Sequence, residues 1–350
     1  MAVLIIAPER DEHAQAVGRE IGRLGVRAEI VDVGAFPETI SLTMRYECCT
    51  GRRAFHLEGH GGRLNLAEFG SVWWRRPSHP SITGAMGRPS HRLFAANEAQ
   101  EALNGLWHSM DADWINNPAL DYVAQRKAYQ LSAAQDVGLT IPATLITSDP
   151  FEARKFVDAR GYRNVVYKSF SSTADEWRET RLLREDEIQL LDLVRHAPVI
   201  FQSYAPAIYD LRITVIDDRI FPAAIFSQET DYTIDCRIDI GNARIEQVAL
   251  PPAVEAQLLA LMRRVGLVYG AIDMRLQPDG TYVFLELNPA GQFLYIEVAS
   301  GLPITVAMAA ALVKRDQARS RDRLDPVLDT GLACPGDHDA MMHSERADTA

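Results

Sequence analysis

Two acidic residues and an asparagine near residue 280 are the side chains in this sequence best suited to bind a metal ion. Asp273 precedes a Pro-Asp-Gly turn, and Glu286 and Asn288 follow it, so the segment predicts a β-hairpin. If Gln277 and Tyr282 flank the turn, Asp273 lies directly across from Glu286. Like charges placed opposite one another destabilise a sheet by a few tenths to about 1 kcal/mol, and a bound cation would remove that repulsion.

The ligand types indicate which metal this is. Two carboxylates and an amide oxygen, with no His or Cys nearby, suit a hard cation such as Mg²⁺, which usually also binds phosphates. The alternative is an ordinary amphipathic hairpin whose polar face is only solvated. The neighbouring arginine and phenylalanine, and the Pro-Ala-Gly turn that follows Asn288, favour the metal site.

Alternation along the hairpin predicts two faces of opposite character. The predicted apolar face carries Ile272, Met274, Leu276, Val283, Leu285 and Leu287. The predicted polar face carries Asp273, Arg275, Phe284, Glu286 and Asn288.

Basic residues on regular elements are candidates for binding phosphate. Lys168 lies in the predicted strand VVYK, where a buried ammonium group needs a charged partner. A lysine that reaches solvent from a sheet edge is the alternative, but the serine-rich loop that follows favours a phosphate-facing position. Further on, strand VIFQSYAP could read an adenine edge, Asp210 could meet a ribose and Arg212 a phosphate, although any strand, turn and salt bridge has the same letters.

Size and composition limit the class of protein. The 350 residues carry a formal net charge of −11, which argues against attraction to nucleic acid or anionic membranes. Cys48, Cys49, Cys236 and Cys334 lack the spacing of a zinc knuckle or a disulfide framework, which favours a reducing cytoplasm. We find neither a signal peptide nor a membrane span in the sequence.

Hydrophobic periodicity predicts the elements that position these residues. A strand over residues 3–8, a helix ending near Gly25 and a second strand form a βαβ start without a G-x-G-x-x-G turn. A polar hairpin over residues 52–66, the strand SVWWRRP and a helix over 91–110 follow. Later helices are predicted over 122–137, 150–161 and 185–196. After Lys314 periodicity is lost, and we expect a mobile tail over residues 315–350.

The order of these motifs resembles the ATP-grasp superfamily: Lys127, VVYK with Lys168, FQSY, D-L-R, IDM and E-L-N. More closely, SVWWRRP, DLRITV, AIDMR and FLELNPAGQFLYIE are similar to the ligases that macrocyclise ribosomal peptides, the graspetide or microviridin-type enzymes. The likeness spans about residues 3–312. One departure is SFSSTADEW, where many ATP-grasp proteins have a glycine-rich lid.

The resemblance implies an α/β (α+β) ATP-grasp fold in three parts. These are an N-terminal βαβ pre-ATP-grasp domain (residues 1–115), a central small α+β subdomain (116–204), and a C-terminal antiparallel-sheet subdomain with the magnesium site (205–314). ATP would lie between the last two parts.

The resemblance also implies roles for individual residues. The implied metal ligands are Asp273, Glu286 and Asn288. The implied nucleotide-binding residues are Lys127 and Lys168 on the phosphates, and Gln202, Ser203, Tyr204 and Asp210 along adenine and ribose. The implied catalytic residues, facing the transferred phosphoryl group and the substrate carboxylate, are Arg212, Arg275 and Asp210. ATP and two Mg²⁺ ions are the implied cofactors.

The implied reaction phosphorylates Asp or Glu side chains of a precursor peptide, and Ser or Thr hydroxyls or Lys amines then attack to form macrocyclic esters or amides. A leader segment of that peptide would dock on residues 185–196 and a neighbouring hairpin. No nucleic acid or membrane partner is expected, and a homodimer is left open. Two alternatives remain: a ligase that adds a free amino acid to a peptide or protein, and a non-catalytic nucleotide-binding scaffold.

Overall fold

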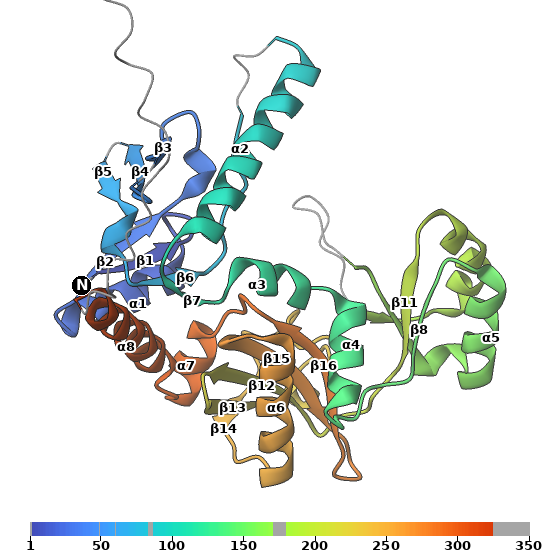
Figure 1. Cartoon of the computed structure of the whole chain (residues 1–350). Helices are drawn as coiled ribbons and strands as arrows, with labels where there is room; N and C mark the ends of the chain where they lie inside the picture. The colour runs from blue at the N-terminus through green and yellow to red at the C-terminus, as the bar shows by residue number, and fades with distance from the viewer. Residues whose placement is uncertain (1, 49, 60, 83–86, 171–179, 325–350) are drawn as a thin grey trace, which may run out of the picture.

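The computed structural model describes residues 2–324 except 49, 60, 83–86 and 171–179. Within these residues, Figure 1 shows an N-terminal part from which helix α2 projects, a small central part at the far end, and a C-terminal sheet between them. No helix in the described part combines the length and the apolar character that crossing a bilayer requires.

The N-terminal sheet is parallel throughout and has the strand order β2-β1-β6-β7. Its strands are β1 (Ala2–Ile6), β2 (Arg27–Val31), β6 (Ser71–Trp74) and β7 (Asp113–Ile115). Helix α1 (Glu12–Arg23) connects the first two strands, and the Asp11 carboxylate caps it by accepting from the Ala14 N–H at 2.8 Å. The predicted βαβ start is therefore confirmed.

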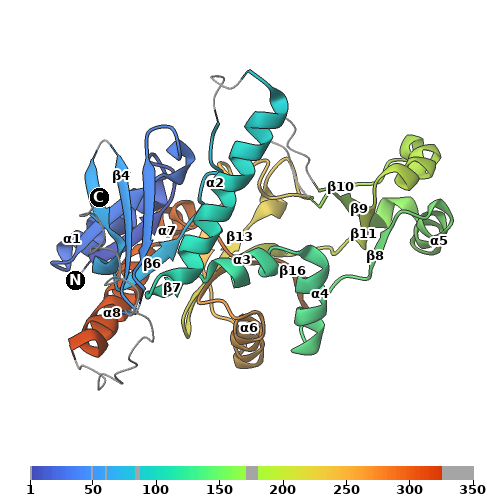
Figure 2. The ribbon, with the colours of Figure 1, turned by 45° about the horizontal axis from the view of Figure 1, so that its top comes forward.

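A separate antiparallel sheet follows, formed by β3 (Ser41–Tyr46), β4 (Arg53–Gly59) and β5 (Gly62–Asn65). The predicted hairpin over residues 52–66 corresponds to β4 and β5, whereas β3 was missed. Helix α2 (Pro89–Ser109) then extends beyond the body of the domain, as Figure 2 shows.

The predicted helix over residues 122–137 is wrong in its extent, because the chain forms two helices there. Asn117 caps α3 (Pro118–Ala124) by accepting from the Ala119 N–H at 3.0 Å, so that helix begins earlier than its apolar pattern suggested. A break at residues 125–126 separates it from α4 (Lys127–Asp136). The break makes Lys127 the first residue of its helix.

The central part is an antiparallel sheet covered on one face by two helices. Its strand order is β10-β9-β11-β8, with β8 (Thr144–Thr147), β9 (Val165–Lys168), β10 (Arg181–Leu182) and β11 (Val199–Ser203). Phe201 of this sheet packs with Val157 of α5 (Pro150–Arg160) and Leu191 of η4 (Glu185–His196). The helix predicted over residues 185–196 is present, but it has 3₁₀ geometry.

The C-terminal part is an antiparallel sheet in the order β14-β13-β12-β15-β16, as expected for this part of the chain. Its strands are β12 (Tyr209–Ile216), β13 (Arg219–Ile225), β14 (Ile245–Gln247), β15 (Tyr269–Leu276) and β16 (Tyr282–Asn288). Helix α6 (Pro252–Val265) packs on one face and ends at Gly266, whose φ of 73° is left-handed. The remaining short helices are η1 (Val33–Ala35), η2 (Leu66–Glu68), η3 (Tyr162–Asn164), η5 (Ser227–Glu229) and α7 (Leu294–Ser300).

Helix α8 (Ile304–Leu324) corrects the prediction that a mobile tail begins at residue 315. It returns to the N-terminal sheet, where the fully buried Asp316 accepts from the Gly70 N–H at 2.9 Å and from the Ala2 N–H at 3.3 Å. These contacts are polar, so hydrophobic periodicity could not reveal them. Residues 325–350 of the predicted tail lie outside the described residues.

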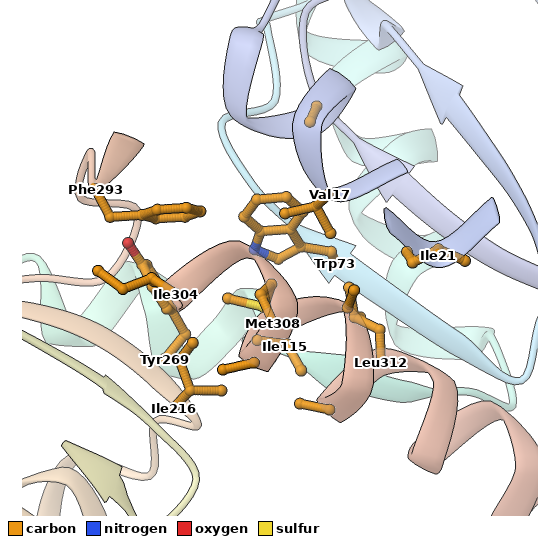
Figure 3. Packing of buried hydrophobic residues seen from close by; sticks show 14 of the residues in the cluster. Val17, Ile21, Trp73, Ile115, Ile216, Tyr269, Phe293, Ile304, Met308 and Leu312 are labelled. Carbon is orange, nitrogen blue, oxygen red and sulfur yellow. The ribbon is translucent and has the colours of Figure 1, made fainter. Parts of the chain in front are cut away.

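One apolar core joins the N-terminal and C-terminal parts. Figure 3 shows Trp73 of β6 facing Met308 of α8, with Tyr269 and Phe293 beside them. All four side chains are buried. The relative position of the two sheets is therefore fixed by packing.

Candidate active site

The hairpin β15–β16 places Asp273 directly across from Glu286, as the sequence predicted. A β-bulge follows at once, because the next paired residues are Met274 and Phe284, and Leu285 is skipped. The bulge shifts the alternation by one residue. The predicted faces are therefore wrong for three residues: Phe284 is buried in the core, Leu285 lines the cleft, and Val283 pairs with Arg275 of the predicted polar face.

Asn288 lies between the two carboxylates. Its Nδ2 donates to Asp273 Oδ2 at 3.1 Å and to Glu286 Oε1 at 3.3 Å. The amide NH₂ group thus partly neutralises a pair of like charges. Burial raises the pKa of Asp273, and repulsion from Glu286 adds to this, whereas Arg212 opposes the shift. All three predicted metal ligands are brought together.

Arg212, on β12, holds Asp273 from the other side. Its Nη1 donates to both carboxylate oxygens, at 2.7 and 2.9 Å, and its Nη2 donates to Gln292 O at 3.0 Å. Burial favours loss of the proton, but the adjacent Asp273 raises the pKa of Arg212, which stays charged. Its buried Nε has no hydrogen-bond partner among the described residues. One donor of this guanidinium is therefore buried without a bond to the described part of the chain.

The two predicted phosphate lysines lie on Glu286's side of the cleft. Lys127 donates from Nζ to Ser169 O at 3.0 Å, which ties the start of α4 to the end of β9. Burial lowers the pKa of Lys168 to about 8, although Glu286 opposes this. Burial alone would raise the pKa of Glu286, but Lys168 and Lys127 bring it below its ordinary value. The lysines therefore contribute positive potential beside one carboxylate.

Arg275 and Asp210 form an ion pair with each other, so their charged groups are bonded within the protein. Arg275 donates through Nε to Asp210 Oδ1 at 2.7 Å, and Ser227 Oγ donates to the other oxygen of Asp210. The Nη atoms of Arg275 bind backbone carbonyls, those of Ala205, Thr233 and Ile234, at 2.9, 3.1 and 2.7 Å. Both residues touch the floor of the cleft, yet these bonds indicate a structural role.

Of the three residues expected along adenine, Gln202 and Ser203 end strand β11 and Tyr204 follows it. The Gln202 amide donates to Thr144 Oγ1 at 2.9 Å, and Ser203 Oγ accepts from Arg160 Nε at 2.9 Å. The Arg275 guanidinium packs over the Tyr204 ring, and its Cζ lies 5.4 Å from the ring centroid. None of the three is among the described residues that line the cleft. Contact with a base through their side chains stays a prediction.

Arg237 is a site residue that the sequence reasoning missed. It forms a two-point ion pair with the buried Asp235, Nε to Oδ1 at 2.7 Å and Nη2 to Oδ2 at 2.5 Å. The hydrogen bond to Asp235 raises the pKa of Arg237, and Glu286 and Asp273 add to the effect. Its segment, between β13 and β14, has no periodic pattern, so only the fold reveals its position at the cleft.

The loop after Asn288 is held from the N-terminal domain, which the sequence reasoning also missed. Fully buried Arg75 donates through Nη1 to Ala290 O at 2.5 Å and to Gly291 O at 2.9 Å. His13 Nε2 accepts from the Phe293 N–H at 3.0 Å. A side chain at Gly291 has no room, since a Cβ there would lie 2.3 Å from the Ala271 side chain. We call residues 289–292 the clasped loop.

These residues line one large cleft of about 1830 Å³ between the three parts of the chain. Its lining includes Arg76, Lys127, Lys168, Arg212, Arg237, Asp273, Glu286 and Asn288. Pockets for one small molecule are typically roughly 300–1,000 Å³, so this cleft has room for more than one ligand.

The donor set fits Mg²⁺. Asp273, Glu286 and Asn288 converge, and their carboxylate and amide groups offer the oxygen ligands that a hard cation prefers. Over the described residues, no three His, Cys, Asp or Glu side chains form a metal-binding group. Two nearby lysines and the open donor of Arg212 provide for the anionic oxygens that would accompany the ion.

Comparison with known proteins gives consistent matches. Residues 2–121 match a family model described as the MvdD pre-ATP grasp domain. No curated protein sequence matches the chain. Among solved structures, the chain is similar to the macrocyclase MdnC of Microcystis aeruginosa MRC, bound with precursor peptide MdnA. The sequence identity is 30% and the TM-score 0.81, over 90% of this chain and 100% of that chain.

Two further structures are similar over nearly their whole length. One is a RiPP-associated ATP-grasp ligase of Chryseobacterium gregarium in complex with ADP and a leader and core peptide, at 27% identity and a TM-score of 0.80, over 90% of this chain and 98% of that chain. The other is the ATP-grasp ligase PsnB complexed with minimal precursor, Mg and ADP, at 24% identity and a TM-score of 0.73, over 90% and 97%.

Proposed function

The chain belongs to the ATP-grasp macrocyclases of ribosomal precursor peptides, and we propose that it uses ATP to join acidic side chains of such a peptide to Ser or Thr hydroxyls or Lys amines. The fold and family predicted from the sequence are thereby confirmed. The observation that carries the proposed reaction is the convergence of Asp273, Glu286 and Asn288 beside Arg212 in a cleft large enough for nucleotide and peptide together.

Asp273, Glu286 and the amide oxygen of Asn288 are proposed to hold Mg²⁺. The amide presents its oxygen instead of its NH₂ group when its plane turns over. The metal would supply neutralisation of phosphate charge. We propose two ions, because two carboxylates together with a triphosphate offer enough oxygens for two six-coordinate shells.

Lys127 and Lys168 are proposed to bind the nucleotide phosphates. The lowered pKa of Lys168 reflects a buried ammonium group with too little negative charge around it. A phosphate would supply that charge and keep the proton on Nζ. Their position beside Glu286 matches the need for cations where phosphate and metal ligands meet.

Arg212 is proposed to orient the carboxylate that becomes phosphorylated. Asp273 and Gln292 O fix its guanidinium, so the unpartnered Nε points from a rigid support. A fixed donor on the acyl oxygen contributes about 3 kcal/mol in comparable oxyanion sites. Arg237, anchored by Asp235, is a second fixed cation for the phosphoryl and acyl oxygens.

Arg275 and Asp210 have a revised role in this proposal. Their mutual bond and the carbonyls that Arg275 binds support a role in positioning the segment around Thr233 that leads to Arg237. For Gln202, Ser203 and Tyr204, the satisfied or buried side chains leave the strand backbone as the better candidate for contact with adenine.

The partner is proposed to be a precursor peptide whose leader docks on η4. Leu190 and Leu193 of this helix are 51% and 56% exposed, more than apolar side chains of a packed helix usually are. A second hollow beside it is lined by Arg154, Glu185, Asp186, Ile188 and Gln189.

The test is incubation of the protein with ATP, Mg²⁺ and a short candidate peptide that carries Glu or Asp together with Ser, Thr or Lys, followed by mass spectrometry. Loss of one water per ring with stoichiometric ADP supports the macrocyclase. Gain of an amino acid mass indicates the ligase alternative. ATP binding without ADP formation indicates the scaffold and overturns the proposal.

A further inference from the structure

Arg76, at the N-terminal side of the cleft, is a cation that the proposed chemistry does not use. It follows β6, is exposed and lines the cleft. Its Nε donates to Ala290 O in the clasped loop at 3.0 Å. Among the residues that the structure describes, no carboxylate forms an ion pair with it. The rest of its guanidinium group is therefore available to a ligand in the cleft.

The surroundings of Arg76 carry excess positive charge. Although Arg76 reaches solvent, partial burial of its guanidinium in the cleft and the adjacent Arg75 lower the pKa of Arg76, with Arg212 contributing and Asp11 opposing. Arg75 has a weak ion pair with Asp11, at 3.4 Å, and its buried Nη2 has no hydrogen-bond partner among the described residues. Burial, with Arg75 second, lowers the pKa of nearby His13 to about 4, so His13 is neutral. Such a region favours an anionic ligand.

This anion site differs from the one at the metal ligands. The cations that act most on Glu286 are Lys168, Lys127 and Arg237, whereas Arg76 interacts chiefly with Arg75 and Asp11. Arg76 also reaches the clasped loop at Ala290, while Arg212 reaches it at Gln292. The two arginines therefore approach the clasped loop at different points, one from the N-terminal domain and one from the C-terminal sheet.

Resting on the proposed function, we propose that Arg76 binds a second acidic side chain of the peptide, one that is not being activated. The planar guanidinium matches a carboxylate in a two-point contact. The cleft has the volume for a peptide segment beside a nucleotide. Holding one carboxylate at Arg76 fixes which neighbouring carboxylate reaches Arg212. Arg76 is thus a specificity-determining residue, and the peptide class it selects has at least two acidic side chains near each other.

A double-mutant cycle between protein and peptide tests this. The probe is a synthetic peptide that carries neighbouring Glu or Asp residues together with Ser, Thr and Lys, and variants in which each Glu or Asp is replaced singly by its amide. The dissociation constant is measured by fluorescence anisotropy without nucleotide, and KM and kcat by ADP release. Arg76→Gln should raise the dissociation constant and KM about tenfold, with the larger effect on KM than on kcat.

One amide replacement in the peptide should weaken binding to the wild-type protein by a similar factor and have no further effect in Arg76→Gln. That coupling is specific to one peptide position, so a merely structural loss at Ala290 cannot produce it. Arg76→Lys should bind the peptide more tightly than Arg76→Gln but less tightly than the wild type. Lysine keeps the positive charge but cannot make the two-point contact of a guanidinium group. Arg63→Gln, an exposed arginine of β5 outside the cleft, is the matched control and should bind as the wild type does.

Additive effects at every acidic position, or unchanged affinity in Arg76→Gln, would overturn the inference. Because the binding measurement needs no turnover, it decides the role of Arg76 even when the wild-type protein forms no ring. Absence of ring formation would count against the proposed function instead.

Discussion

Arg275 donates through Nε to Asp210 at 2.7 Å, and both side chains are buried, so the pair is a closed ion pair beneath the cleft floor. Asp210→Ala leaves the Arg275 charge uncompensated and should lower the free energy of unfolding by about 3–5 kcal/mol. Asp210→Leu combined with Arg275→Met should lower it less, because no lone charge remains buried. Urea denaturation followed by circular dichroism measures both. Equal losses in the two variants would argue against the buried pair.

Glu286→Gln should abolish ADP release while preserving the fold. The substitution removes one of the two facing carboxylates and keeps the Arg212–Asp273 ion pair intact. Loss of one electrostatic contributor of this kind typically reduces turnover by about 10²–10³. ADP release is measured with a coupled assay, and the midpoint of urea denaturation serves as the control for folding. Turnover like that of the wild type would refute the metal assignment.

His13 should make the protein less stable in mild acid. Its Nε2 accepts from the backbone of Phe293, and burial lowers its pKa from 6.5 to about 4. The unfolded chain binds a proton below pH 6.5 that the folded protein excludes, so stability falls as pH drops from about 6.5 to about 4, by about 3 kcal/mol. His13→Gln keeps an acceptor without titrating. Denaturation from pH 7.5 to 4 should therefore show a shallower slope for this variant; identical slopes would contradict the prediction.

Asp121 should have the opposite pH dependence. Burial raises its pKa from 3.8 to about 6, and its Oδ2 has no hydrogen-bond partner among the described residues. The folded protein retains a proton that the unfolded chain has lost, so stability falls as pH rises from about 4 to about 6. Asp121→Asn removes the charge and should be more stable at pH 7.5 by up to about 3 kcal/mol. At pH 4 the two proteins should differ little, and a gain that is constant with pH would contradict this explanation.

The sequence predicted the hairpin that pairs Asp273 with Glu286, because a Pro-Asp-Gly turn and short-range alternation fix which residues face each other. It did not predict the exchange of Phe284 and Leu285, since a β-bulge adds one residue without a sequence signal of its own. The end of α8 was missed for another reason. Asp316 stabilises it through backbone groups of Gly70 and Ala2, far away in the chain.

The arginines of the cleft also show which contacts the sequence could not predict. Arg212 was found because it lies in a motif close to other candidate residues. Arg75 and Arg76 depend on the clasped loop, a partner that only the fold brings near. Arg237 pairs with Asp235 two residues before it, but only the fold places that pair at the cleft. The catalytic role of Arg275 stays a prediction, and its strand position did not reveal that its donors bind backbone carbonyls.

The clasped loop links the N-terminal domain to the hairpin that we propose binds the metal. Arg75 and His13 bind the backbone of Gly291 and Phe293, shortly after Asn288. A substitution that moves one domain therefore also moves this backbone in the other. Hybrid enzymes that graft a relative's amino-terminal half onto this carboxyl-terminal half should lose turnover unless both sides of this junction come from one parent. Recombination in nature faces the same barrier, and the two halves should be inherited as a unit.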